Sequence, residues 1–106
     1  MRDIPVRLRE WISAGRQVGK RRDLMREGEA IYQTMGIQRS GDVFVAYYFE
    51  IPEALMAVEE NALELMERFE TLEAALAFLE KVSGSDVLDM TPQKRGKIFR
   101  VRTGDS

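Results

Sequence analysis

A long stretch without glycine or proline follows Pro52, and it constrains the fold more than any other feature of the sequence. Residues 53–81 consist mostly of Ala, Leu, Glu and Met, which are the strongest helix formers. Pro52 suits the start of a helix, and Glu53 in the first turn suits the helix dipole. We therefore predict a long amphipathic helix over about residues 53–81.

The apolar residues of this stretch recur at alternating intervals of three and four, which is a heptad pattern. The seam consists of Leu55, Val58, Ala62, Leu65, Phe69, Leu72, Leu76 and Leu79. We expect the core to contain Leu65, Phe69, Leu72, Leu76 and Leu79. The apolar face is widened by Met56, Leu63, Met66 and Phe78. A face this wide suits packing against a protein surface, so these last four residues are the predicted protein interface.

Two alternatives remain open within the stretch. Thr71 can cap a second helix, so the first helix can break at Glu70 and Thr71. Residues 62–69 can then form a strand, because Leu63, Leu65 and Phe69 also fit a period of two.

Two segments are typical of strands. Residues 43–49 are β-branched and aromatic and lie between Gly41 and Pro52, which predicts a strand that is buried on both faces. Residues 97–101 combine Ile98 or Phe99 and Val101 with flanking Lys and Arg, which are typical of an exposed edge strand. The two predicted strands can pair with each other.

The first third of the chain favours helical segments. Asp3 and Pro5 can start a helix, although a strand over residues 4–8 is an alternative because its apolar residues alternate. Residues 21–35 have apolar residues at helical spacing, and Gly36 provides a helix stop. Gly28 lowers helix propensity, so a hairpin over residues 29–33 is a second possibility.

The predicted fold class is therefore α+β. A small sheet, with strands near 43–49 and 97–101, is covered by the long amphipathic helix over about 53–81, and helical segments lie at the N-terminus. Residues 1–102 form a single small domain and residues 103–106 a flexible tail. Two or three strands make a poor sheet alone, which favours a homodimer or a complex with another protein.

Charge is sorted into blocks along the chain. Residues 1–39 carry nine basic and five acidic side chains, residues 40–90 two basic and twelve acidic, and residues 91–106 five basic and one acidic. Contact with nucleic-acid phosphates is assigned, as the alternative function, to Arg16, Lys20, Arg21, Arg22, Arg26, Lys94, Arg95 and Lys97, with Arg100 and Arg102 beside them. These cations can equally pair with the acidic centre, and the isoelectric point near 5.2 argues against a dedicated nucleic-acid binder.

Two further groups of side chains have a structural and a functional interpretation. The acidic row is Glu53, Glu59, Glu60, Glu64, Glu67, Glu70, Glu73 and Glu80. It can bind a hard cation or a basic partner, or it can be the solvated face of the helix. The aromatic group is Trp11, Phe44, Tyr47, Tyr48 and Phe49. It can stack on bases, or it can belong to the core.

The sequence lacks both Cys and His, which excludes disulfides and thiol catalysis and removes the commonest general base and metal ligand. We predict no catalytic residue, no metal site and no cofactor. We expect no secretory signal, because Arg2 and Asp3 are not followed by an apolar stretch of signal-peptide length. The longest apolar run has seven residues, far below the roughly 20 that span a bilayer, so we expect a cytoplasmic protein without membrane contact. The predicted function is a small non-enzymatic protein–protein interaction module, an adaptor, regulator or inhibitor. The alternative is a nucleic-acid-binding regulatory protein, and an enzyme that uses Glu and Tyr is a third hypothesis.

Overall fold

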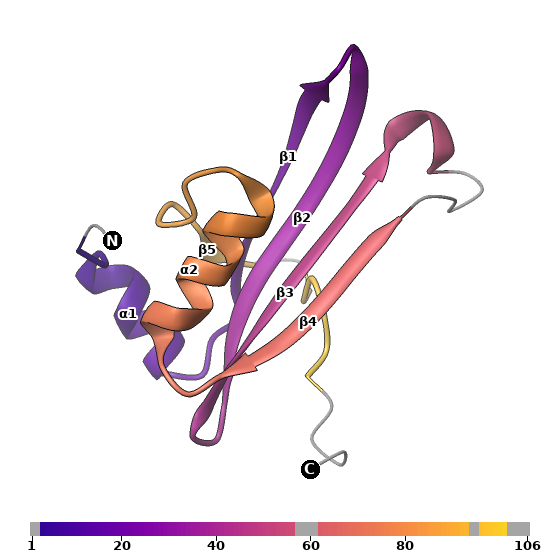
Figure 1. Cartoon of the computed structure of the whole chain (residues 1–106). Helices are drawn as coiled ribbons and strands as arrows, with labels where there is room; N and C mark the ends of the chain where they lie inside the picture. The colour runs from indigo at the N-terminus through magenta and orange to yellow at the C-terminus, as the bar shows by residue number, and fades with distance from the viewer. Residues whose placement is uncertain (1–2, 57–61, 94–95, 102–106) are drawn as a thin grey trace.

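A five-stranded antiparallel sheet with two helices packed against one of its faces forms the fold (Figure 1). The computed structural model describes residues 3–56, 62–93 and 96–101. The elements are α1 (Val6–Ser13), β1 (Val18–Arg26), β2 (Glu29–Ser40), β3 (Val43–Pro52), the short 3-10 helix η1 (Glu53–Leu55), β4 (Leu63–Phe69), α2 (Leu72–Ser83) and β5 (Thr91–Pro92). The strand order is β4-β3-β2-β1-β5, so the predicted α+β class is confirmed.

The predicted helix over residues 21–35 is wrong, because this segment forms the β1–β2 hairpin. Glu27 and Gly28 both have positive φ angles, 53° and 82°, which is the backbone of a tight two-residue hairpin turn. Residues of β2 alternate between the two sheet faces, and the face toward the helices carries Ile31, Met35 and Ile37 in the core. Burial on a sheet face has thus overridden the local helical spacing.

The strand predicted at residues 43–49 is confirmed as the first part of β3, which extends to Pro52. It lies between β2 and β4 in the sheet. Four successive residues, Val45 to Tyr48, are buried, so β3 is covered on both faces as predicted.

The predicted long helix over 53–81 is also wrong. The structure has β4 followed by α2, which corresponds to the strand-then-helix alternative, while residues 57–61 lie outside the described part of the chain. β4 pairs with β3 from Phe44–Phe69 to Glu50–Leu63, so the sheet supplies the backbone hydrogen bonds that a helix would have made internally. Thr71 caps α2, its Oγ1 accepting a hydrogen bond of 3.1 Å from the Ala74 amide.

Both ends of the chain differ in part from prediction. The helix predicted from Asp3 and Pro5 is present as α1, so the strand alternative over residues 4–8 is wrong. α1 is one helix of eight residues whose N-cap is Pro5 without a side-chain cap, so the predicted series of N-terminal helical segments is not confirmed. Residues 97–101 form no strand, and the edge beside β1 is occupied by β5 instead. The predicted tail, residues 103–106, lies outside the described residues.

The core lies between the sheet and the two helices. It contains Leu8 and Ile12 of α1, Leu72, Ala75, Leu76 and Leu79 of α2, and Val18, Met35, Ile37, Ala46 and Tyr48 of the sheet. Among the predicted core residues, Leu65 and Phe69 are only partly buried and pack against this cluster.

A smaller cluster covers part of the opposite sheet face, which we call the open face. Phe99 stacks on Tyr47 with ring centroids 5.1 Å apart, beside Val45. Gly19 and Gly36 lie directly opposite each other on β1 and β2, and this is where Ile98 and Phe99 approach the backbone. Residues 96–101 therefore lie across the open face as an irregular segment rather than extending the sheet.

Candidate functional site

β4 is an edge strand, and its outer side is the main candidate for an interaction site. β4 pairs with β3 on one side, and no strand among residues 3–56, 62–93 and 96–101 pairs with it on the other (Figure 1). An edge strand presents backbone N–H and C=O groups that can pair with another chain. We call this outer side of Leu63–Phe69 the β4 edge.

Exposed apolar side chains lie along the β4 edge. Leu63 is 44% exposed and Met66 is 40% exposed, although both are large and hydrophobic. Met56, 45% exposed, follows η1, which begins directly after β3, and Leu63 pairs with Glu50 near that end of β3. Phe78 of α2 is half-buried, and its ring centroid lies 5.3 Å from that of Phe69. The structure thus exposes three of the four predicted interface residues, and their role as an interface stays a prediction.

The two faces of β4 differ in chemistry. The pairing with β3 directs Leu63, Leu65 and Phe69 to the helix-covered face, and Glu64 and Met66 to the open face. On the open face, the Tyr47 hydroxyl donates a hydrogen bond of 2.6 Å to Glu64. Burial, followed by this hydrogen bond and the carboxylate charge, raises the pKa of Tyr47 above its usual value, so the hydroxyl stays protonated and holds Glu64 in place.

A groove separates β4 from the irregular segment that crosses the open face. It is lined by Tyr47, Glu64 and Met66 on the sheet side and by residues 97–101 on the other. Lys97 is therefore exposed at this groove rather than on a strand.

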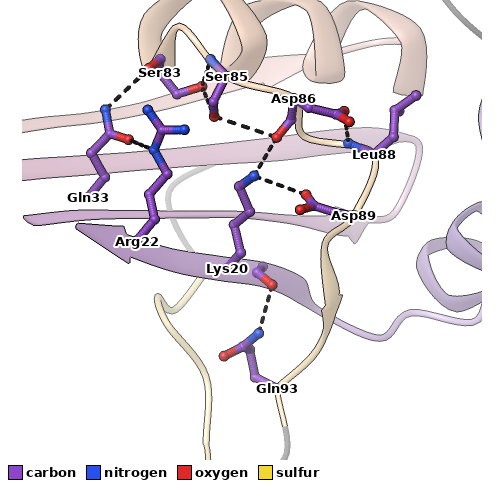
Figure 2. A network of polar contacts seen from close by, with 10 residues as sticks. Lys20, Arg22, Gln33, Ser83, Ser85, Asp86, Leu88, Asp89 and Gln93 are labelled. Carbon is purple, nitrogen blue, oxygen red and sulfur yellow. Dashed lines mark hydrogen bonds and ion pairs between the residues drawn. The ribbon is translucent and has the colours of Figure 1, made fainter. Parts of the chain in front are cut away.

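Most of the basic segment predicted to contact nucleic acid is bound to the protein itself. Lys20 donates to the backbone carbonyl of Asp86 and, at 3.0 Å, to the Asp89 carboxylate (Figure 2). Arg22 Nε donates to Gln33 Oε1 at 2.7 Å, and Arg21 donates to Gln93 Oε1 at 3.2 Å. These contacts tie β1 to β2 and to the residues that follow α2.

The Arg22 contact is the start of a chain of polar groups on the helix-covered face. Gln33 is fully buried, and its amide donates to the Tyr48 hydroxyl at 2.6 Å and to the Ser83 carbonyl at 3.3 Å. Tyr48 in turn donates to Glu50 at 2.5 Å. Burial is the main cause that raises the pKa of Tyr48 above its usual value.

An ion pair completes this chain. Arg26 donates to Glu50 at 2.7 Å. That hydrogen bond is the main cause that lowers the pKa of Glu50 below its ordinary value. The chain joins β1, β2, β3 and the end of α2, so it stabilises the sheet beyond the region that the helices cover.

The expected placement of the charged residues on helices is wrong. Arg21 and Arg22 point to opposite faces of β1, since they are successive residues of a strand. Arg16 lies exposed in the loop before β1, while Lys94 and Arg95 lie outside the described residues. The structure therefore does not gather the predicted nucleic-acid residues on one described surface.

The acidic row is dispersed as well. Glu64 and Glu67 lie on opposite faces of β4, and Glu73 pairs with Arg9 at 3.0 Å. Glu53 lies in η1, Glu70 follows β4, Glu80 lies in α2, and Glu59 and Glu60 lie outside the described residues. In the part of the chain that the structure describes, no three Asp or Glu residues form a group that could hold a metal ion.

The aromatic residues are largely structural. Tyr48 is fully buried, Tyr47 is covered by Phe99, and Phe44 and Phe49 are half-buried. Trp11 packs against the helix-side core, with the Arg7 guanidinium 5.9 Å from its ring. Sequence reasoning missed the buried glutamines Gln17 and Gln33. Gln33 is buried because it lies in β2, and the Gln17 side chain bonds Gln38 and the backbone of Ile98 and Phe99, which are distant in sequence.

Within the described ranges, no helix has the length and apolar character needed to cross a membrane. Comparisons of the chain with protein-family models, with curated proteins and with solved structures found no match. The function is therefore inferred from the geometry of the described residues.

Proposed function

We propose that this chain is a small, non-enzymatic protein–protein interaction module, an adaptor, regulator or inhibitor, that binds a partner protein through the β4 edge. The observation that carries the proposal is an edge strand with two exposed large apolar residues, Leu63 and Met66. Charges, proline or a covering segment usually blunt such an edge, and β4 carries the charges of Glu64, Glu67 and Arg68. Leu63 and Met66 nevertheless stay exposed beside these charges. A partner strand would satisfy the backbone groups and bury the apolar side chains.

The chemistry of this edge favours a protein over a nucleic acid. Phosphate contacts need exposed cations, and β4 contains Arg68 together with two carboxylates, Glu64 and Glu67. Four of the five cations between residues 16 and 26 donate hydrogen bonds within the protein. Lys20 and Arg26 pair with the carboxylates of Asp89 and Glu50, whereas Arg21 and Arg22 donate to the neutral side chains of Gln93 and Gln33. These internal contacts support the interpretation in which the basic segment is engaged largely within the protein.

The tyrosine geometry supports a binding role rather than a catalytic one. The hydroxyls of Tyr47 and Tyr48 donate to Glu64 and Glu50, and burial raises the pKa of both tyrosines. Both therefore remain protonated near neutral pH and are poor general bases. We propose no cofactor for this function, and a cytoplasmic location suits a chain without cysteine.

Site-specific photo-cross-linking in cells tests the proposal. A photoreactive amino acid replaces Leu63 or Met66, and the matched controls carry it at Val6 or Met25, which are also exposed and apolar but lie on α1 and β1. We expect discrete protein adducts from the two β4 positions and not from the controls. Equal adducts at all four positions would contradict the proposal.

The alternative function is tested in parallel by fluorescence anisotropy with labelled duplex DNA and single-stranded RNA. The salt concentration is stepped from about 50 to 200 mM, the range over which phosphate contacts lose most affinity. We expect no binding. Binding that falls linearly with the logarithm of salt concentration would instead favour the nucleic-acid function.

A further inference from the structure

We propose that the partner of the β4 edge is the β4 strand of a second copy of this chain, paired antiparallel about a two-fold axis at Met66. The inference rests on the proposed function, because it assigns an occupant to the same edge. A two-fold axis perpendicular to the sheet keeps the helices of both copies on the same side and joins the two sheets into one. Each residue then lies opposite a residue on the same face of its partner.

The sequence of β4 is complementary to itself in this register. Centring on Met66 places Glu64 opposite Arg68 of the second copy, and the symmetry repeats this pair on the other side of the axis. Both ion pairs and the central Met66 pair lie on the open face. On the helix-covered face, Leu63 lies opposite Phe69 of the second copy at both ends, and Leu65 lies opposite Glu67.

Other symmetric registers of β4 lack this complementarity. An axis at Glu64, Glu67 or Arg68 places that charged residue directly opposite its own copy, and like charges in this position are destabilising. An axis at Leu65 places Glu64 opposite Met66 and forms no ion pair. Charge therefore selects the register centred on Met66.

Burial and preorganisation point to the same register. Leu63 and Met66 are two of the most exposed apolar residues of the described chain, and pairing would cover both. Glu64 is already held on the open face by the 2.6 Å hydrogen bond from Tyr47. A carboxylate that is fixed before binding loses less conformational freedom when an ion pair forms.

The first test measures the mass of the full chain by sedimentation equilibrium over a range of concentrations. We expect a reversible dimer. Met66→Lys would place two ammonium groups opposite each other at the axis and abolish it, whereas Met25→Lys, an equivalent change on β1, would leave it intact. Circular dichroism establishes that each variant is folded. A dimer that Met66→Lys leaves unchanged would overturn the inference.

A charge exchange tests the register. Glu64→Arg alone and Arg68→Glu alone each place like charges opposite each other in two symmetric pairs, so each should weaken the dimer by about tenfold. The double variant Glu64→Arg, Arg68→Glu restores opposite charges and should recover most of that loss. Additive weakening in the double variant would overturn the register.

A single introduced cysteine gives an independent test of the register, because the chain has no cysteine of its own. Met66→Cys places one thiol at the axis, where it meets its copy at the short distance of opposed strand residues, so mild oxidation should give a covalent dimer. Met25→Cys serves as the control and should stay monomeric under the same oxidation. A wild-type chain that stays monomeric at all concentrations overturns this inference. Photo-adducts of other proteins at Leu63 and Met66 would in that case still support the proposed function. A monomer without such adducts would contradict both proposals.

Discussion

Glu50 is the residue whose protonation should destabilise the fold at acidic pH. Its carboxylate accepts hydrogen bonds from Arg26 and Tyr48, and it connects them to the buried Gln33. The Arg26 hydrogen bond lowers the pKa of Glu50 below its ordinary value of 4.5 in the folded state. Stability from this lowered pKa is therefore present above pH 4.5 and is lost as the pH falls through the folded-state pKa.

We predict that Glu50→Gln lowers the free energy of unfolding at neutral pH by about 1 kcal/mol, since it weakens a hydrogen bond to a half-exposed arginine. The difference from the wild type should shrink below about pH 4, where the wild-type carboxylate also begins to protonate. Urea titrations of both proteins at several pH values measure this. A difference that stays constant down to about pH 3 would contradict the role of Glu50 ionisation.

At the scale of elements, strand β3 was predictable and strand β4 was ambiguous. The apolar run around Tyr47 and Tyr48 is too short for a typical helix, and its burial on both faces follows from its composition. Leu63, Leu65 and Phe69 fit both a heptad and a period of two, so their local spacing does not decide the structure. The pairing with β3 decides it, and that pairing is not visible in local propensity.

The candidate interaction site could likewise be predicted only in part from the sequence. Met56, Leu63 and Met66 stand out in the sequence because they widen the apolar face, and the structure places them on the surface. Their position along a sheet edge depends on the strand order, which joins segments that are distant in sequence. The hydrogen bonds that Lys20 and Arg22 make within the protein could not be predicted either, because they depend on β1 lying beside β2 and beside the residues after α2.

Thr71 separates β4 from α2, and its cap should have a measurable effect. Thr71→Ala removes the acceptor of the Ala74 amide and should lower the free energy of unfolding by about 1 kcal/mol. Thr71→Ser keeps a hydroxyl at the same position and should cost much less. Equal losses for both variants in urea titrations would show that the hydroxyl has no capping role.

The irregular segment over residues 96–101 depends on Gly36. A Cβ at this position would lie 2.8 Å from the Val18 carbonyl oxygen and 3.2 Å from a ring carbon of Phe99. We predict that Gly36→Ala costs about 1–3 kcal/mol through overpacking and displaces Phe99 from Tyr47.

Hydrogen exchange measures that displacement, because the Ile98 amide donates to the buried Gln17 side chain at 2.6 Å in the intact structure. Exchange at Ile98 should accelerate in the Gly36→Ala variant. In a Phe99→Ala background the same change at Gly36 should cost less, since one of the two close contacts is gone. A cost that is unchanged in this background would exclude Phe99 as a cause.

At the scale of the whole molecule, the helices cover one face of the sheet and residues 96–101 cover part of the other. The sheet can still be extended at the β4 edge and beside β1 beyond Gly19, because β5 pairs only with Val18 and Gly19. Part of the basic segment is engaged within the fold, since Lys20 and Arg26 pair with Asp89 and Glu50 and Arg22 donates to the neutral Gln33. The apolar residues Leu63 and Met66 of β4, in contrast, stay exposed. A partner that supplies another strand at the β4 edge would cover them, as proposed.

If that partner is a second copy, the stability of the protein must depend on its concentration. A dimer that unfolds to two separate chains gains about 2.7 kcal/mol per dimer from a hundredfold increase in concentration. For a chain of this size that corresponds to a rise in Tm of about 5 °C, provided that both concentrations exceed the Kd of the dimer. Scanning calorimetry of the wild type should show this rise, while the Tm of Met66→Lys should stay constant and that of Met25→Lys should follow the wild type. A wild-type Tm that does not change with concentration would mean that the β4 edge contributes nothing to self-association, and the exposed Leu63 and Met66 would then await a different protein.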